Sequence, residues 1–331
     1  MDKIFLAFDQ ILGQHRALNI LKKAIKYKRL YPCYLFTGEE GVGKKKTALA
    51  FAMILNCDNG YGCMKCISCK KIEKGVHPDV MIVEPKRLET TIDQVRELKR
   101  KLSFKPYEGK WRVVIFPKAE TLTIPAANAL LKTLEESPDY VVIILITKNP
   151  SLLLPTIVSR SQKIQFASLS PSIIKNILTK EEKISLEEAE IISRVSHGSI
   201  KKAFDILNEG NIKQKRGNLV KIDAIAKKGS FREIKMAATN LSKEDTTQLL
   251  TFLNFLISWY RDILILKAIG KDDLLINYDL IGEIKRRANS LTLEKIIKIL
   301  KLVVECYEAI KGNANKELSL EILLTKIGEI Q

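Results

Sequence analysis

The stretch YLFTGEEGVGKKK, from Tyr34 to Lys46, joins a short apolar run to a glycine-rich turn and the start of a helical pattern. Such a turn binds phosphate because its glycines let backbone N–H groups wrap the anion, while a lysine adds positive charge. The sequence therefore predicts a phosphate-binding loop between a buried strand and a helix. The residues that form it are Gly38, Gly41, Gly43 and Lys44.

The same loop lacks the hydroxyl that holds Mg²⁺ in working ATPases, because Lys45 occupies the position of the usual serine or threonine. Thr47 lies two residues further on, about 200° around a helix, so its hydroxyl is not expected to substitute. Binding of ATP or ADP is therefore possible, but hydrolysis is not expected.

An ATPase also needs acids at the end of a second buried strand. The candidate strand is WRVVIF, from Trp111, and it is followed by Pro117, Lys118 and, two residues later, Glu120. Proline cannot bind a metal and lysine repels one, and we expect Glu120 to be a solvated loop charge. The strand therefore predicts an inactive site.

The region from Cys33 to Phe166 alternates short β-branched runs with helical patterns, which predicts a parallel α/β sheet. Because the runs are almost continuously apolar, they should be buried on both faces. We expect five strands, in the runs that begin at Tyr34, Val80, Trp111, Val141 and Lys163.

After Ser168 only helical periodicity remains, first in a short region broken by Pro171 and Gly198. A polar joint, NIKQKRGN, begins at Asn211, and amphipathic helices follow it. We therefore expect three domains: an α/β domain at 1–168, a small helical lid at 169–210 and an all-α domain at 211–331.

The composition agrees with a folded, soluble protein. The chain has 331 residues, 46% of them hydrophobic, and a formal net charge of +17. This charge favours polyanionic partners, but the lysines are spread along the chain, so no DNA contact can be named from charge alone. The longest apolar runs are too short, or are interrupted by Arg261 and Asp262, and no export signal is present. We expect a cytoplasmic protein with no membrane contact.

Four cysteines follow the loop helix in the pattern C-x₅-C-x₂-C-x₂-C. Thiolates this close together suit tetrahedral zinc, and four sulfurs leave no position for a substrate, so the site should be structural. Disulfides are the alternative, which a reducing cytoplasm disfavours. His77 could be a further ligand, but a turn cap is the better interpretation, and Cys33 and Cys306 should be inert core thiols. The expected zinc ligands, in a module at 57–69, are Cys57, Cys63, Cys66 and Cys69.

Arg160 stands between two serines in PTIVSRSQKIQF, just before the last expected strand. A guanidinium at the rim of a nucleotide domain either pairs with a local carboxylate or reaches the γ-phosphate of a neighbouring subunit. Spacing alone favours the local ion pair.

These motifs, in this order, resemble the AAA+ clamp-loader subunits of bacterial DNA polymerase III, and among them the delta-prime type. The resemblance covers nearly the whole chain. Its most specific segment is AANALLKTLEESPDYVVIILIT, from Ala126. Further matches are ILGQ at Ile11, the four-cysteine insert, HPD at His77, and the segments WYRDIL and NANKELSLEILL near the C-terminus.

The resemblance implies a rigid, non-hydrolysing subunit, because Pro117 and Lys118 occupy the positions of the family's catalytic acids. It assigns Arg160, in a motif where Ser161 replaces the family's cysteine, as an arginine finger for the ATP site of an adjacent motor subunit. Lys201 corresponds to the motor subunits' sensor arginine. The implied assembly is a hetero-pentamer with gamma or tau motor subunits and a delta subunit, held by the helical domain as a collar. Within the DNA polymerase holoenzyme, it would open the sliding clamp and place it on primed DNA.

Two other functions remain open. The intact glycines and Lys44 would suit an active motor ATPase of the same family. The charge and the cysteines would suit a zinc-containing nucleic-acid-binding protein, although that reading accounts for neither the sheet nor the collar.

Overall fold

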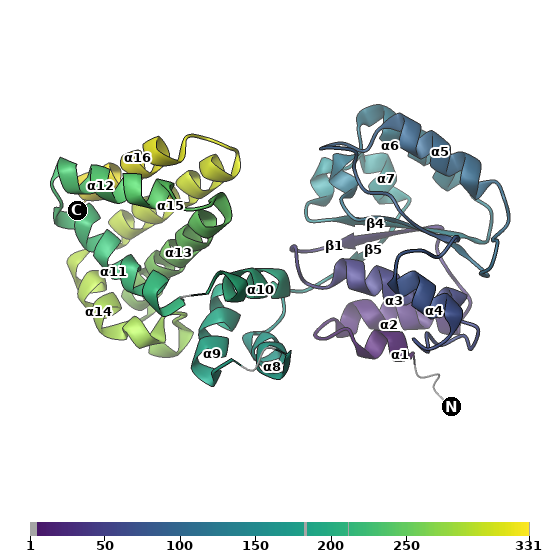
Figure 1. Cartoon of the computed structure of the whole chain (residues 1–331), viewed down its shortest axis with the longest axis horizontal. Coiled ribbons are helices and arrows are strands. Elements are labelled where there is room, and N and C mark those ends of the chain that lie inside the picture. Colours follow the sequence, from purple (N-terminus) through teal and green to yellow (C-terminus); the bar gives the residue numbers. More distant parts are fainter. Residues whose placement is uncertain (1–4, 182–183, 211, 331) are drawn as a thin grey trace. The chain divides into compact units, whose positions relative to one another are not determined.

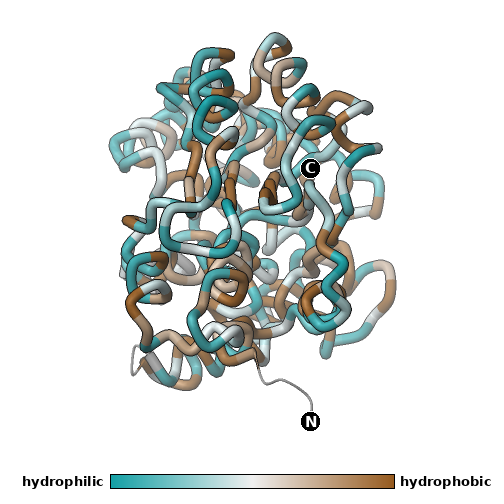
Figure 2. Tube along the Cα trace, turned by 90° about the vertical axis from the view of Figure 1, so that its right-hand side faces the viewer, coloured by the Kyte–Doolittle hydropathy of each residue, from teal (hydrophilic) through white to brown (hydrophobic). Residues whose placement is uncertain are grey.

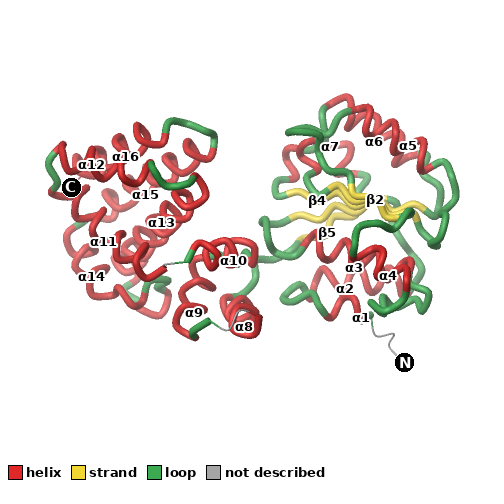
Figure 3. Tube along the Cα trace, viewed as in Figure 1, coloured by secondary structure: helices red, strands yellow, loops and turns green. Residues whose placement is uncertain are grey.

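The computed structural model describes residues 5–181, 184–210 and 212–330. The chain divides into two compact units, which we call the sheet unit (residues 1–173 and 198–201) and the helical unit (residues 174–197 and 202–331). Figure 1 and Figure 3 show that the described strands lie in the sheet unit.

The sheet unit contains five strands in the order β2-β3-β4-β1-β5, and every pair is parallel. This confirms the predicted α/β sheet and each of its five strands. The order places β1 between β4 and β5, with Leu35 opposite Leu145. The strands are β1 (Cys33–Thr37), β2 (Val80–Ile82), β3 (Arg112–Phe116), β4 (Val141–Thr147) and β5 (Gln162–Gln165).

Helices cover both faces of this sheet (Figure 1). One face is packed by α1 (Leu6–Asp9), α2 (His15–Lys26), α3 (Lys44–Asn56) and α4 (Ile67–Glu73). The other is packed by α5 (Ile92–Leu102), α6 (Ile124–Glu135) and α7 (Pro155–Ser159). Short 3₁₀ turns lie at Ala119–Thr121 and Pro150–Leu152.

Alternate residues of each strand supply the two cores, because successive side chains of a strand point to opposite faces. Tyr34 and Phe36 of β1 pack with α2 and α3, whereas Leu35 packs with α6 and α7. All residues of β1, β3 and β4 are buried, as expected for central strands covered on both sides.

The helical unit contains no strand among its described residues. Several of its helices begin at a side-chain cap, such as Ser230 with Glu233 at α12, and α13 ends at Gly270 in a left-handed conformation. Figure 2 shows that hydrophilic and hydrophobic residues alternate along the trace of the chain. The helices that follow the sheet are α8 (Pro171–Glu181), α9 (Leu186–Val195), α10 (Ile200–Glu209), α11 (Ile212–Lys228), α12 (Phe231–Ser242), α13 (Thr246–Ile269), α14 (Ile281–Ser290), α15 (Leu293–Lys311) and α16 (Lys316–Ile330), with 3₁₀ turns at Asp272–Leu274 and Tyr278–Leu280.

Helix α13 differs from expectation. Within the described ranges it is the one helix long and apolar enough to cross a membrane, although Arg261 and Asp262 lie in it. However, 61% of its apolar window is buried. It packs against α14 and α15, so it serves as the core helix of the helical unit.

The expectation that the polar joint NIKQKRGN lies outside the helices was wrong. Asn211 lies outside the described residues, but α11 begins at Ile212, so the stretch that follows is helical. Lysine, glutamine and arginine are good helix formers, which a reading based on polarity alone overlooks. The sheet unit extends to residue 173 and takes in residues 198–201. The division into three domains at residues 168 and 210 stays a prediction.

Candidate nucleotide pocket and cysteine cluster

The phosphate-binding loop lies directly between β1 and α3, as predicted. Gly38, Gly41 and Gly43 have φ angles of +140°, +80° and +98°, which side chains other than glycine rarely adopt. Gly43 is the N-cap of α3, so the first turn of this helix presents its backbone N–H groups to the loop.

Lys44 is the first residue of α3, and its side chain curls back over the loop. Its Nζ donates hydrogen bonds to the carbonyls of Gly38 and Glu39. Burial lowers the pKa of Lys44. Thr47 is fully buried, and its Oγ1 donates to the Gly43 carbonyl at 2.9 Å, which confirms that it does not take the place of the missing hydroxyl.

A cavity of about 500 Å³ opens at the carboxyl ends of the strands, beside this loop. Ligands of open parallel sheets bind at this edge. Its charged lining consists of six lysines and three glutamates: Lys44, Lys45, Lys46, Lys118, Lys148, Lys201, Glu40, Glu84 and Glu120.

Lys45 and Lys118 line this cavity where an ATPase has metal-binding groups. The Nζ of Lys45 lies 2.8 Å from Oε1 of Glu84, which follows β2. Pro117 also lines the cavity and offers no ligand. The glycines and Lys44 therefore fit a phosphate chain, whereas Lys45, Pro117 and Lys118 do not fit Mg²⁺.

The expectation for Glu120 was wrong. The 3₁₀ turn at Ala119–Thr121 folds this residue into the cavity wall, where its side chain is half-buried. Its Oε2 is buried without a hydrogen-bond partner among the described residues. The tight turn therefore places Glu120 in the cavity wall, although its position along the chain suggested an exposed loop.

Residues 198–201 pack directly on the loop. The Ile200 N–H donates to the Gly41 carbonyl at 3.0 Å, and Lys201 Nζ lies 2.6 Å from Glu40 Oε1. The hydrogen bond from Lys201 lowers the pKa of Glu40. A Cβ on Gly41 would lie 2.2 Å from Oγ of Ser199, so this close approach requires glycine.

Arg160 is the C-cap of α7 and pairs with α6. One of its guanidinium nitrogens lies 2.8 Å from Oε1 of Glu135. The two side chains are 46% and 51% exposed, so this is a surface ion pair. The local pair favoured by spacing alone is therefore present, and the role of Arg160 toward another subunit stays a prediction.

The four cysteine sulfurs lie within 4.8 Å of one another. Ligands about 2.3 Å from a tetrahedral zinc ion are about 3.8 Å apart, so the cluster fits this metal. Cys57 is the C-cap of α3, and Cys66 is the N-cap of α4, which carries Cys69. None of the four forms a disulfide, although the sequence left that possibility open.

Backbone N–H groups support these sulfurs. The N–H groups of Cys63, Cys66 and Cys69 donate to Sγ of the preceding cysteine in the cluster, at 3.3–3.4 Å. Hydrogen bonding from the N–H of Lys65 lowers the pKa of Cys63 to about 6, whereas burial raises the pKa of Cys66 and that of Cys69. Hydrogen bonds to a sulfur favour its thiolate form, which is the form that binds metal.

The other cysteines are buried, as expected, and lie outside the cluster. Burial raises the pKa of Cys33 to about 12 and that of Cys306 to about 11. Both remain protonated at neutral pH, so neither is reactive.

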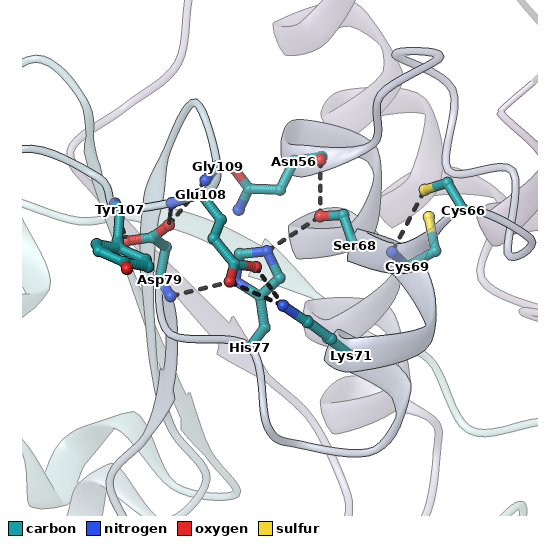
Figure 4. Close-up of polar contacts among 10 residues, drawn as sticks. All are labelled: Asn56, Cys66, Ser68, Cys69, Lys71, His77, Asp79, Tyr107, Glu108 and Gly109. Carbon is teal, nitrogen blue, oxygen red and sulfur yellow. Dashed lines mark hydrogen bonds and ion pairs between the residues drawn. The ribbon is translucent and has the colours of Figure 1, made fainter.

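His77 supports the cysteine module and is not one of the clustered ligands (Figure 4). Its Nε2 lies 3.0 Å from Oγ of Ser68, and its Nδ1 accepts the N–H of Asp79. Ser68 in turn donates to the Asn56 carbonyl at 2.9 Å. The expectation that His77 caps a turn is confirmed, and its ring links this turn to α4.

Asp79 fixes the loop that precedes β3. Its fully buried carboxylate accepts the N–H groups of Tyr107, Glu108 and Gly109 at 2.7–2.8 Å (Figure 4). Burial alone would raise the pKa of Asp79, but these N–H groups outweigh it and hold the pKa below its ordinary value. The Lys71–Glu108 ion pair joins the same loop to α4.

Sequence reasoning missed Glu84 and Lys148 as parts of the pocket. Glu84 closely follows β2 and Lys148 directly follows β4. A usable signal was available, because residues just after parallel strands meet at one edge of a sheet.

The chain is similar to known proteins along most of its length. Residues 13–170 match the family described as "DNA polymerase III, delta subunit", and residues 212–329 match "DNA polymerase III, delta subunit, C terminal". DNA polymerase III subunit delta' of Bacillus subtilis is 32% identical over 321 residues, which cover 96% of each chain. The chain belongs to the delta-prime family of DNA polymerase III. This confirms the resemblance drawn from the motifs.

The chain is also similar to a tau subunit and to a gamma subunit-related protein. The tau subunit of Bacillus subtilis is 26% identical over 97% of this chain, which spans 61% of the tau length. A gamma subunit-related protein of Thermotoga maritima has 18% identity over 93% of this chain and 98% of its own, with a TM-score of 0.44. Because a tau subunit is also similar to this chain, the family match alone does not distinguish a non-hydrolysing subunit, which we call a stator, from a motor ATPase.

Proposed function

We propose that this delta-prime family member is the non-hydrolysing subunit of its clamp loader. A single observation carries the proposal. Lys45 and Lys118 line the phosphate cavity where an ATPase presents a magnesium-binding hydroxyl and acid. With ammonium groups at both positions, the site lacks the hydroxyl and the strand-end acid that hold the cation and polarise a water molecule for attack.

The positive contribution of the chain would be Arg160, acting on the ATP site of an adjacent motor subunit. Its ion pair with Glu135 is exposed, and such pairs contribute only about 0–1 kcal/mol, so it can be exchanged at low cost for a phosphate contact. An arginine finger supplied in trans accelerates hydrolysis by about 10³–10⁵-fold.

The partners follow from this role. They would be the gamma or tau motor subunits and a delta subunit in a hetero-pentamer, with the helical unit as collar. The sliding clamp and primed DNA would be engaged by the assembled complex in the cytoplasm. The cysteine cluster would hold one structural Zn²⁺ ion through Cys57, Cys63, Cys66 and Cys69. Metal analysis of native protein should find about one equivalent.

The decisive experiment compares ATP turnover by the reconstituted complex with wild-type chain and with Arg160→Ala. We expect normal assembly and a strong loss of turnover. Arg96→Ala is a matched control, because Arg96 is also an exposed arginine in a weak ion pair, on α5. Unchanged turnover with Arg160→Ala would remove the finger assignment.

The competing function is that of a motor ATPase, which the intact glycines and Lys44 favour. The purified chain alone distinguishes the two. A stator should not turn over ATP, whereas turnover that Lys44→Ala abolishes would establish a motor.

A further inference from the structure

The cavity beside the phosphate loop is more basic than a Mg²⁺-nucleotide site requires. Six lysines and three glutamates line it, which leaves an excess of positive charge before any ligand binds. A magnesium complex of ATP has lost much of its negative charge to the cation, whereas the free phosphate chain retains it. The free chain is therefore the better electrostatic match.

Two of the three carboxylates that line this cavity pair with ammonium groups, and the third, Glu120, has a buried Oε2 with no hydrogen-bond partner among the described residues. Glu84 pairs with Lys45 at 2.8 Å, and Glu40 pairs with Lys201 at 2.6 Å. Magnesium requires near-octahedral oxygen ligands and binds through free carboxylates, hydroxyls and phosphates. A cation placed here would have to displace these lysines or bind through Glu120 alone, in a cavity that Lys118 also lines.

We infer that this pocket binds the phosphate chain of a nucleotide without Mg²⁺, with the Lys45 ammonium group in place of the cation. The inference rests on the proposed function, since a pocket that hydrolysed ATP would need the metal. It goes further, because it states which form of the ligand binds and how Mg²⁺ changes its affinity.

The lysines can reach a ligand because their present pairs are weak. The side chains of Lys45 and Glu84 are 49% and 52% exposed, and exposed pairs contribute only about 0–1 kcal/mol. A phosphate chain carries more charge than a single carboxylate, so the Lys45 ammonium group can leave Glu84 and pair with a phosphate instead. Lys44 is already at the loop and donates to its carbonyls, which places its Nζ beside the glycine turn.

The sign of the magnesium effect tests the inference. Titration calorimetry of the full chain with ATP and with inorganic tripolyphosphate, in EDTA, should detect binding of both. Saturating Mg²⁺ should weaken the binding of each ligand by about tenfold. The cation neutralises phosphate charge that two or more lysines would otherwise contact. Equal affinity for the two ligands would assign the site to phosphate alone, and tighter ATP binding would add contacts with the nucleoside. Either result supports the inference.

Two variants of Lys45 and a control variant test whether Lys45 causes the effect of Mg²⁺ on ATP binding. Lys45→Gln should weaken ATP binding in EDTA by about twofold to fivefold, the contribution of one exposed charge pair. Lys45→Ser restores the hydroxyl and should reduce the weakening by Mg²⁺. Lys70→Gln, an exposed lysine on α4 outside the cavity, should change neither quantity.

Two results would overturn the inference. One is tighter binding with Mg²⁺ than without it, and the other is no binding at a ligand concentration of about 1 mM, where even weak complexes form. Failure here leaves the stator role intact, since that role is measured by the effect of Arg160 on the turnover of a partner. Hydrolysis by the chain alone would remove both.

Discussion

Replacing Asp79 with asparagine should destabilise the sheet unit strongly, although the two side chains have nearly the same shape. Asp79 is fully buried and accepts three backbone N–H groups from residues 107–109. An asparagine offers one acceptor oxygen where the aspartate offers two. Either the N–H of Tyr107 or the pair from Glu108 and Gly109 would therefore face an NH₂ group.

The size of the effect follows from these contacts. Hydrogen bonds to a charged acceptor contribute about 1.5–3 kcal/mol each, and a buried donor left without a partner costs about 1–3 kcal/mol. Losing at least one such bond and weakening the others should cost about 3 kcal/mol. For a unit of this size, that lowers the melting temperature by about 6–12 °C.

Scanning calorimetry of Asp79→Asn beside Asp139→Asn would measure this loss. Asp139 is exposed in the turn before β4 and has no hydrogen-bond or ion-pair partner among the described residues, so its replacement should change stability by no more than about 0.5 kcal/mol. If Asp79→Asn melts within a degree or two of Asp139→Asn, the loop is not held by this carboxylate and the reasoning fails.

The pH dependence provides a second check with a definite sign. The pKa of Asp79 is lowered in the folded protein, so its contribution is complete above the unfolded value of about 3.9. It is lost as the pH falls through the lowered folded value. The difference between wild type and Asp79→Asn should therefore be constant near neutral pH and shrink in acid, below about pH 4.

Two further predictions concern the helical unit and the cysteines. In the helical unit, Arg287→Met should cost about 3–5 kcal/mol in a urea titration, because it leaves the buried carboxylate of Asp223 without the guanidinium 2.9 Å away. Arg286→Met, on the exposed side of the same helix, should be nearly neutral, and equal losses would contradict the buried-pair argument. Removing metal with a chelator should lower the melting temperature of the sheet unit, more readily at pH 6 than at about pH 8, because thiolates must stay deprotonated to hold zinc. An unchanged melting curve would mean that the cluster folds without metal.

Local features of the sequence were sufficient to predict the five strands and the cysteine cluster. Apolar β-branched runs predicted the five strands, because buried parallel strands need continuous hydrophobicity. The spacing of the cysteines predicted their cluster, since residues this close along the chain can surround one ion with only short turns between them. Local reading failed at the polar joint, where α11 begins at Ile212, because helix propensity outweighed polarity.

The sequence by itself determined the sheet, the glycine loop, the cysteine cluster and the absence of a hydroxyl at Lys45. Only the tertiary structure decided what surrounds that lysine. Glu84, Lys118 and Lys148 come from the ends of different strands and meet at one edge because the strands are parallel and ordered β2-β3-β4-β1-β5. Strand order depends on packing between distant segments, and no periodicity within a segment encodes it. For the same reason, the sequence did not show which carboxylate pairs with Arg160. Only the packing of α7 against α6 brings it to Glu135.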